Sequence, residues 1–282
     1  MNLSDLRYLI SDMDGVLWRG ETAVPHLPTF FQTLDAHHIQ FVLATNNASK
    51  TPAQYVAKLA KFGIAVQPHQ IMTSALATAG YLASHAPHAK IYMVGGDGLR
   101  EALTAEGLTI LPRTERDDTA DVVVVGLTAE VTYTDMANAT IHIRRGARFI
   151  GCNPDATFPS EYGQLPGNGS LLALIQTATS VTPTVIGKPG PIMFHECLRR
   201  LGPSATPANT AMLGDRLNTD ILGAQGVGLP TILVLSGVDT AVELALSTHQ
   251  PDFVFNDVAA LADAIRNEQG TMNKRPLVNA SQ

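Results

Sequence analysis

The feature that most constrains the fold is a repeated alternation between short apolar runs and segments with helical spacing. The run 39–45 precedes a pattern in which Tyr55, Leu59 and Phe62 share one helical face, and Gly63 follows its end. Runs that are apolar along their whole length are typical of strands buried on both faces of a parallel sheet. The sequence therefore predicts an α/β protein with a doubly wound parallel sheet. Further strands are expected at 8–11, 90–96, 120–127, 147–152, 210–215, 230–237 and 251–256, and further helices at 25–38, 97–107, 133–146, 218–228, 240–247 and 257–267.

Chemically active residues follow four of these runs. In an open parallel sheet the carboxyl ends of the strands form one edge, where ligands bind. Each group alone fits a turn or a helix cap, but their shared position favours a common site. The residues are Asp12 and Asp14 after 8–11, Thr45, Asn46 and Asn47 after 39–45, Lys188 after 183–186, and Asp215 after 210–214 with Asp220 beyond it.

The close spacing of Asp12 and Asp14 needs an explanation, because neighbouring carboxylates repel unless a cation or a shared proton compensates them. A turn is the simplest interpretation of Asp-Met-Asp-Gly. With the other strand ends, the pattern indicates phosphoryl transfer instead. Asp12 and Asp215 would hold Mg²⁺. One of the paired aspartates would attack phosphorus and the other would transfer protons. Lys188, Thr45 and a backbone N–H near Asn46 would surround the phosphate oxygens.

Composition limits the classes of partner. The 282 residues are 45% hydrophobic and 16% charged, with a formal net charge of −6. An acidic chain lacks the basic face that nucleic acid or an anionic membrane requires, so neither is an expected partner. Two cysteines are too few for a disulfide framework, and no run approaches the ~18 apolar residues of a membrane span. The sequence therefore predicts a cytoplasmic protein, with a loose tail over 269–282.

The motifs "DMDGV", "TNN", "GKP" and "GDRLNTD" resemble those of the haloacid dehalogenase-like (HAD) superfamily, and within it subfamily IIA, the 4-nitrophenylphosphatase and phosphoglycolate phosphatase-like branch. The resemblance extends to about residue 267. It implies a Mg²⁺-dependent phosphatase acting on a small phosphomonoester through an aspartyl-phosphate. The implied roles are Asp12 as nucleophile, Asp14 as general acid and base, Thr45, Asn46, Asn47 and Lys188 in substrate binding, Asp12, Asp215 and the Asp14 backbone carbonyl as metal ligands, and Asp220 behind them.

The long interval between Thr45 and Lys188 fits this resemblance, because the branch carries an α/β cap domain inserted there. The interval also has strand and helix patterns of its own. The expected organisation is a core over 1–77 and 183–268 with a cap over 78–182. A Pro- and Gly-rich loop in the cap, 152–170, is the expected contact to the leaving group. A homodimer is left open.

Several alternatives have weaker support. A dinucleotide-binding protein would show Gly-x-Gly-x-x-Gly after its first strand, but "DMDGVL" lacks it and "GGDGLR" is incomplete. No P-loop motif occurs. A phosphomutase using the same intermediate and a non-catalytic sensor of phosphorylated ligands both stay open. We expect Cys152 to be a buried thiol and Trp18 to serve packing.

Overall fold

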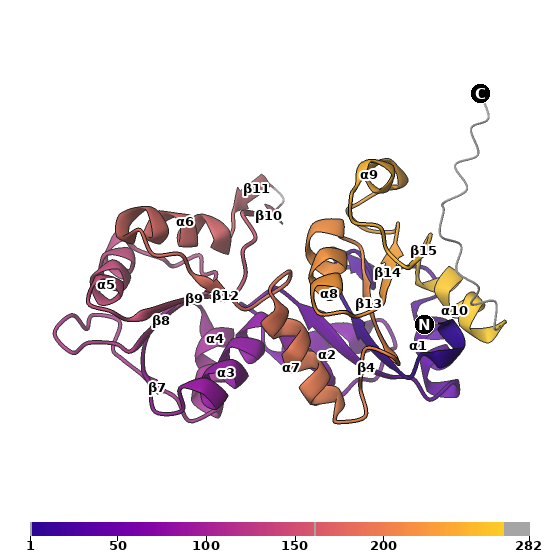
Figure 1. Cartoon of the computed structure of the whole chain (residues 1–282), viewed down its shortest axis with the longest axis horizontal. Coiled ribbons are helices and arrows are strands. Elements are labelled where there is room, and N and C mark those ends of the chain that lie inside the picture. Colours follow the sequence, from indigo (N-terminus) through magenta and orange to yellow (C-terminus); the bar gives the residue numbers. More distant parts are fainter. Residues whose placement is uncertain (1, 161, 268–282) are drawn as a thin grey trace. The chain divides into compact units, whose positions relative to one another are not determined.

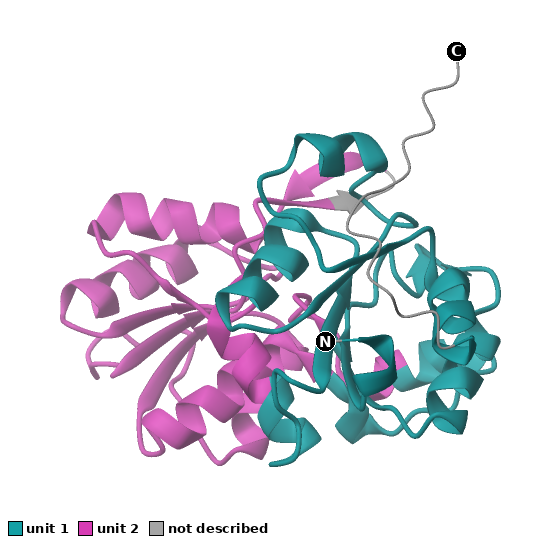
Figure 2. Cartoon of the chain, turned by 45° about the vertical axis from the view of Figure 1, so that its right-hand side comes forward, with its two compact units in different colours: residues 1–44, 56–71, 197–282 teal, residues 45–55, 72–196 magenta. Residues whose placement is uncertain are grey.

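The computed structural model describes residues 2–160 and 162–267, and the loose tail expected over 269–282 lies outside them. The chain divides into two compact units, which Figure 2 colours separately. Unit 1 comprises 1–44, 56–71 and 197–282, and unit 2 comprises 45–55 and 72–196. The predicted cap covers 78–182, and unit 2 extends beyond it at both ends and also includes 45–55.

Unit 1 is built on a parallel sheet whose strand order is β15-β14-β13-β1-β4-β5; Figure 1 labels β15, β14, β13 and β4 of this sheet. Within it, β1 (Tyr8–Ser11) pairs in parallel with both β13 (Thr210–Gly214) and β4 (Gln40–Thr45). Every residue of β13 is buried, as expected for a central strand with helices on both faces. The remaining strands are β14 (Thr231–Val234), β15 (Phe253–Phe255) and β5 (Ile71–Thr73), which runs on into unit 2, with the short antiparallel pair β2 (Trp18–Arg19) and β3 (Thr22–Ala23) outside the sheet.

The helices of unit 1 follow the predicted apolar spacing. In α1 (Leu27–Ala36) the buried residues are Leu27, Phe30, Thr33 and Leu34, and this helix packs against α10 (Val258–Arg266). Asp257 caps α10 by accepting a hydrogen bond from the backbone N–H of Ala260 at 2.9 Å. The other helical segments are η1 (Leu3–Asp5), η2 (Pro68–Gln70), the π-helical turn η3 (Leu217–Ile221), α8 (Leu222–Gly226) and α9 (Ala241–Leu246), while α2 (Pro52–Lys61) and α7 (Pro191–Leu201) each have residues in both units.

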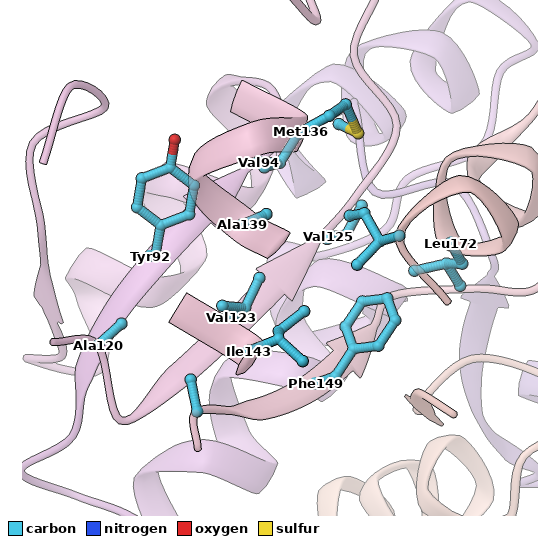
Figure 3. Close-up of a cluster of buried hydrophobic side chains, with 12 residues drawn as sticks. Tyr92, Val94, Ala120, Val123, Val125, Met136, Ala139, Ile143, Phe149 and Leu172 are labelled. Atoms are coloured by element: carbon cyan, nitrogen blue, oxygen red, sulfur yellow. The ribbon is translucent and has the colours of Figure 1, made fainter. Parts of the chain in front are cut away.

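Unit 2 has a second parallel sheet with the order β12-β9-β8-β6-β7. Figure 3 shows its core, where side chains of α5 (Tyr133–Arg144) face those of β8 (Val122–Val125) and β9 (Arg148–Gly151). The apolar runs thus form parallel strands in both units, which confirms the predicted fold class. The other elements are α3 (Ser74–His85), β6 (Lys90–Val94), α4 (Asp97–Ala105), β7 (Thr109–Ile110), α6 (Asn168–Thr179) and β12 (Thr184–Val185).

One prediction for this unit was wrong. The segment expected to be a Pro- and Gly-rich loop contains β10 (Thr157–Ser160) and β11 (Gly163–Pro166), which pair as an antiparallel hairpin. Gly163 has φ +108°, a conformation that glycine adopts without steric cost, and it lies where the chain reverses between the two strands.

Candidate functional site

Three aspartates gather at the carboxyl edge of the unit 1 sheet. Asp12 follows β1 and Asp215 follows β13, and these strands are direct neighbours. The Asp12 N–H donates to the carbonyl of Leu213 at 2.8 Å, which extends the strand pairing by one residue. One carboxylate oxygen each from Asp12, Asp215 and Asp220 lies within 4.8 Å of the others. Asp12 is 9% exposed, and Asp215 and Asp220 are buried. The topology therefore concentrates three acidic side chains in a nearly closed place.

The orientation of Asp215 is fixed by the loop after β14. The backbone N–H of Val238 donates to Asp215 Oδ2 at 2.7 Å. Two glycines leave room for this carboxylate, because a Cβ on Gly237 would lie 1.9 Å from Oδ2 and one on Gly15 would lie 2.1 Å from it. Gly15 also has φ +89°. Both positions require glycine. Gly15 was interpreted only as part of a turn and no role was predicted for Gly237, because their partner Asp215 is distant along the chain.

Asp220 organises the turn that follows β13. Its Oδ2 accepts hydrogen bonds from the backbone N–H groups of Asp215, at 3.3 Å, and Arg216, at 3.2 Å. A Cβ on Gly214 would lie 2.2 Å from Cβ of Asp220, so this strand end needs a glycine as well. The segment is the π-helical turn η3, where the sequence pattern predicted an ordinary helix from residue 218. Such π-helical turns are common beside functional sites, and this one contains Asp220 of the acidic group.

The donor set fits a hard divalent cation. Mg²⁺ prefers oxygen ligands at about 2.0–2.1 Å, so opposite ligands around it lie about 4.2 Å apart. One carboxylate oxygen each from Asp12, Asp215 and Asp220 lies within 4.8 Å of the others, so the three are near enough to share one ion. Asp220 lies within this group by distance, and its role behind the metal ligands stays a prediction.

The side chain of Asp14 is bound to Trp18. Its Oδ1 accepts a hydrogen bond from Trp18 Nε1 at 2.7 Å, and the turn between the two residues is closed by a bond from the Gly15 N–H to the Trp18 carbonyl. Trp18 is fully buried, packs against Phe62 and lies under Lys58, whose Nζ is 4.7 Å from the ring centroid. The packing role predicted for Trp18 is confirmed. Its hydrogen bond to Asp14 was not foreseen, because the residue type alone gives no signal for it.

The predicted phosphate-binding residues Thr45, Asn46 and Asn47 lie in unit 2. Thr45 Oγ1 accepts from the N–H of Asn47 at 3.1 Å, and Asn47 Oδ1 accepts from the N–H and the hydroxyl of Ser49 at 2.8 and 2.7 Å. These local bonds give the segment after β4 a defined turn, as short polar side chains often do.

Asn46 connects this turn to two other segments of unit 2. Its Nδ2 donates to the Lys188 carbonyl at 2.9 Å and to Asp155 Oδ1 at 3.3 Å. Its own carbonyl accepts from Ser74 Oγ at 2.6 Å and from Asn153 Nδ2 at 2.7 Å. The structure therefore brings Asn46 together with the backbone of Lys188. Asn153 and Asp155 were within the predicted cap loop but were not named as partners of Asn46.

Two further residues considered in the sequence analysis, Lys188 and Cys152, are both buried. Lys188 is 3% exposed and follows Gly187, where a Cβ would lie 2.6 Å from Asn46 Oδ1. Cys152 is buried, and its burial raises the pKa of the thiol to about 12, so the predicted structural role is confirmed. Within residues 2–160 and 162–267, none of the helices combines the length and hydropathy that crossing a bilayer requires.

Comparison with known proteins assigns the chain to a family. A model of haloacid dehalogenase-like hydrolases matches residues 9–109, and a model described as HAD-hydrolase-like matches 185–261. An acid sugar phosphatase of Staphylococcus epidermidis is 40% identical over 251 residues, covering 89% of this chain and 94% of that protein. The chain belongs to the haloacid dehalogenase-like hydrolases.

Solved structures place this hydrolase in subfamily IIA. A 4-nitrophenylphosphatase of Thermotoga maritima aligns with a TM-score of 0.86 and 32% identity, covering 93% of this chain and 98% of the other. A glycerol phosphate phosphatase of Mycobacterium tuberculosis, solved in complex with magnesium, aligns with a TM-score of 0.83 and 32% identity, covering 94% and 80%. The family resemblance predicted from the four motifs is thus confirmed, and the protein is an enzyme of the phosphoric monoester hydrolase type.

Proposed function

We propose that this HAD-like hydrolase is a Mg²⁺-dependent phosphatase that hydrolyses a small phosphomonoester through an aspartyl-phosphate on Asp12. The observation that carries the proposal is the group of Asp12, Asp215 and Asp220, whose carboxylate oxygens lie within 4.8 Å of one another at the end of β1 and β13. A divalent cation offsets the repulsion among such carboxylates. Bound there, Mg²⁺ would neutralise charge on a phosphate oxygen.

The proposed chemistry uses the chain's own groups in two steps. In the first, a carboxylate oxygen of Asp12 forms a bond to phosphorus, and the bond from phosphorus to the leaving oxygen breaks. Asp14 donates a proton to that oxygen. In the second, Asp14 takes a proton from water, whose oxygen bonds to phosphorus and releases inorganic phosphate and the free Asp12 carboxylate. The bond from Trp18 to Asp14 supports this role because it gives the carboxylate one orientation.

The substrate-binding roles of Thr45, Asn46, Asn47 and Lys188 stay predictions from the motif resemblance. We propose that the substrate is a sugar phosphate. The support for that class is the likeness to acid sugar phosphatases over most of both chains. The neighbour named 4-nitrophenylphosphatase makes 4-nitrophenyl phosphate a suitable reporter substrate.

The deciding experiment measures phosphate release by the purified chain from a panel of sugar phosphates and from 4-nitrophenyl phosphate. We expect activity with Mg²⁺, none in chelator, and recovery when Mg²⁺ is restored. The variant Asp12→Asn should lose turnover while keeping its fold, since an amide is a far poorer nucleophile and a weaker cation ligand. The control is Asp35→Asn, which changes an exposed aspartate of α1.

Full activity in chelator, or in Asp12→Asn, would contradict the proposal. Tight binding of phosphorylated ligands without phosphate release would indicate a sensor. Transfer of the phosphoryl group to a sugar hydroxyl in place of water would indicate a phosphomutase.

A further inference from the structure

In the sheet of unit 2, the strands that follow β6 in the chain lie on opposite sides of it. From β6 the chain passes through α4 to β7 on one side, and it then returns to β8 on the other side of β6. Numbered along the chain, the strand order is 2-1-3-4-5, and the four strand pairings are all parallel. In open parallel sheets of this order, a crevice forms outside the carboxyl ends of strands 1 and 3, and ligands bind there. In this protein those strands are β6 and β8.

A pocket of about 290 Å³ lies at this point. The segment Val94–Asp97 after β6 forms one wall and Leu127–Glu130 after β8 forms another, with Arg113 from the segment after β7. Its volume is near the lower end of small-molecule sites, which run from about 300 to 1,000 Å³. All its lining residues belong to unit 2, and no predicted catalytic residue is among them. The pocket is therefore built by unit 2 alone, whereas the acidic group is built by unit 1.

Two arginines give the pocket donors for an anion. Arg113 Nε donates to Asp135 Oδ1 and Nη2 to Asp135 Oδ2, each at 2.5 Å, and Nη2 also donates to the carbonyl of Glu130. These bonds hold the guanidinium in one orientation, and its side chain is still 48% exposed. Arg100 lies on the first turns of α4, is exposed, and forms no ion pair with another residue in the described part of the chain. A planar guanidinium held by a carboxylate is well suited to oxyanions.

The backbone after β6 complements these cations. Gly96 precedes α4 and offers no side chain to cap it, so no side chain at this position occupies the first N–H groups of the nine-residue helix, whose start lines the pocket. Thr128 and Ser49 also line the pocket; the Ser49 hydroxyl donates to Asn47, and the Thr128 hydroxyl accepts from the N–H of Glu130 and keeps its own proton to donate. The incomplete "GGDGLR" motif of the sequence lies at this position, where small residues let a ligand approach the backbone.

The pocket also contains acceptors. Asp97 and Glu130 line it and are exposed, whereas Asp135 is occupied by Arg113 and Thr132. A purely anionic ligand such as free phosphate would leave the first two carboxylates unused and would be repelled by them. A ligand with hydroxyl groups next to its anion would satisfy them as hydrogen-bond acceptors.

We propose that this pocket, formed by the ends of β6 and β8 with Arg100 and Arg113, is a second ligand site that binds a hydroxylated phosphomonoester of monosaccharide size. The anion lies against the start of α4 and the two arginines, and the hydroxyl groups face Asp97 and Glu130. The inference does not depend on the proposed catalytic function, because it rests on a different sheet and on different residues.

The test is a titration followed by nuclear magnetic resonance on the full-length ¹⁵N-labelled chain with Asp12→Asn in chelator, which keeps the probe intact. The probe is ribose 5-phosphate. We expect saturable shifts of the amide resonances of Gly96, Gly98 and Thr128 with a Kd of about 1 mM or lower. The Gly15 amide reports separately on the acidic group of unit 1.

The variant Arg100→Glu should weaken binding at Gly96 and Gly98 by about tenfold or more, because it replaces an attractive charge by a repulsive one. The control Arg148→Glu changes an exposed arginine at the opposite end of the same sheet and should leave the Kd unchanged. A second variant, Ala129→Trp, should fill the pocket and abolish the shifts.

Three results would overturn the inference. One is the absence of saturable shifts at Gly96 and Gly98. Another is equal weakening by Arg100→Glu and Arg148→Glu. The third is binding of uncharged ribose, or of inorganic phosphate, as tightly as ribose 5-phosphate. Absence of phosphate release by the unmodified chain in the presence of Mg²⁺, together with normal shifts at these amides, would contradict only the proposed function.

Discussion

At the scale of single residues, the two aspartates of the first motif are separated by their partners. Asp12 joins Asp215 and Asp220, whereas Asp14 accepts a hydrogen bond from Trp18. The carboxylate of Asp12 thus lies in the proposed cation site, and the carboxylate of Asp14 is bound to a neutral donor. The sequence predicted both residues because each follows an apolar run. It could not predict how Gly237 and Val238 surround Asp215, since that contact joins segments more than 20 residues apart.

Replacing Asp14 by Asn tests its role in proton transfer. We expect Asp14→Asn to slow hydrolysis of alkyl phosphates by about 10²- to 10⁴-fold. Hydrolysis of 4-nitrophenyl phosphate should slow less in its first step, because the phenolate leaves without a proton. Loss of the base for the water step should then let the aspartyl-phosphate accumulate, with a burst of 4-nitrophenol in rapid-mixing kinetics. Equal losses on both substrates and no burst would assign Asp14 to the metal or to the fold.

Gly237 offers a test of the cation site that does not change any ligand. In Gly237→Ala the new Cβ would lie 1.9 Å from Asp215 Oδ2, so the carboxylate must shift. We expect the Mg²⁺ concentration for half-maximal activity to rise about 10- to 100-fold, as when outer partners of metal ligands are changed. Gly226→Ala is the matched control, because a Cβ there has no described atom within 4 Å. An unchanged Mg²⁺ dependence in Gly237→Ala would remove Asp215 from the proposed site.

At the scale of secondary structure, the predicted elements are those with a strong period. The apolar runs at β1, β4, β8 and β13 and the helical spacing of α2 and α10 are regular enough to indicate strands and helices. The strand pair β2-β3 was missed because two residues are too few to show an alternation, and β10-β11 was missed because its four-residue strands contain proline and glycine. The π-helical turn η3 was missed because it differs from an α-helix by a single inserted residue.

The start of α5 carries a charge pair whose effect on stability depends on pH. Hydrogen bonds from Arg113 and Thr132 lower the pKa of Asp135 from 3.8 to about 2. A carboxyl whose pKa is lower in the folded state stabilises it above pH 4, and this stabilisation is lost as the pH falls toward 2. We therefore expect Asp135→Asn to reduce the free energy of unfolding by about 2 kcal/mol at pH 7 and by less at pH 3.

Urea unfolding followed by circular dichroism at pH 7, 5 and 3 measures this difference. The control is Asp263→Asn, which removes an exposed pair with Arg266 and should change stability by less than about 1 kcal/mol. The same loss for Asp135→Asn at every pH would show that packing, and not the charge, is the source of the effect.

At the scale of the whole molecule, the two sheets differ in whether their strands come from one stretch of the chain or from two. The sheet of unit 1 takes β1 and β4 from the first part of the chain and β13, β14 and β15 from the last part. The five strands of the unit 2 sheet all come from one continuous stretch, Lys90–Val185. The sequence predicted an inserted domain from the interval between Thr45 and Lys188. It could not predict that 45–55 would be grouped with that domain, because the contacts of Asn46 with Ser74 and Asn153 are not encoded by any local pattern.

This difference predicts how fragments of the chain behave. A fragment over 72–196 contains the whole five-stranded sheet and every member of its buried cluster, from Tyr92 to Ile175. A segment with its own sheet and core can fold alone, so we expect a cooperative thermal transition and well-dispersed amide resonances. A fragment over 197–267 has β13, β14 and β15 but lacks β1, the partner of β13 throughout Thr210–Leu213. It would expose one edge of a fully buried strand, so we expect it to stay unfolded or to aggregate. A cooperative transition in 197–267, or none in 72–196, would show that stability in this enzyme does not follow the continuity of its sheets.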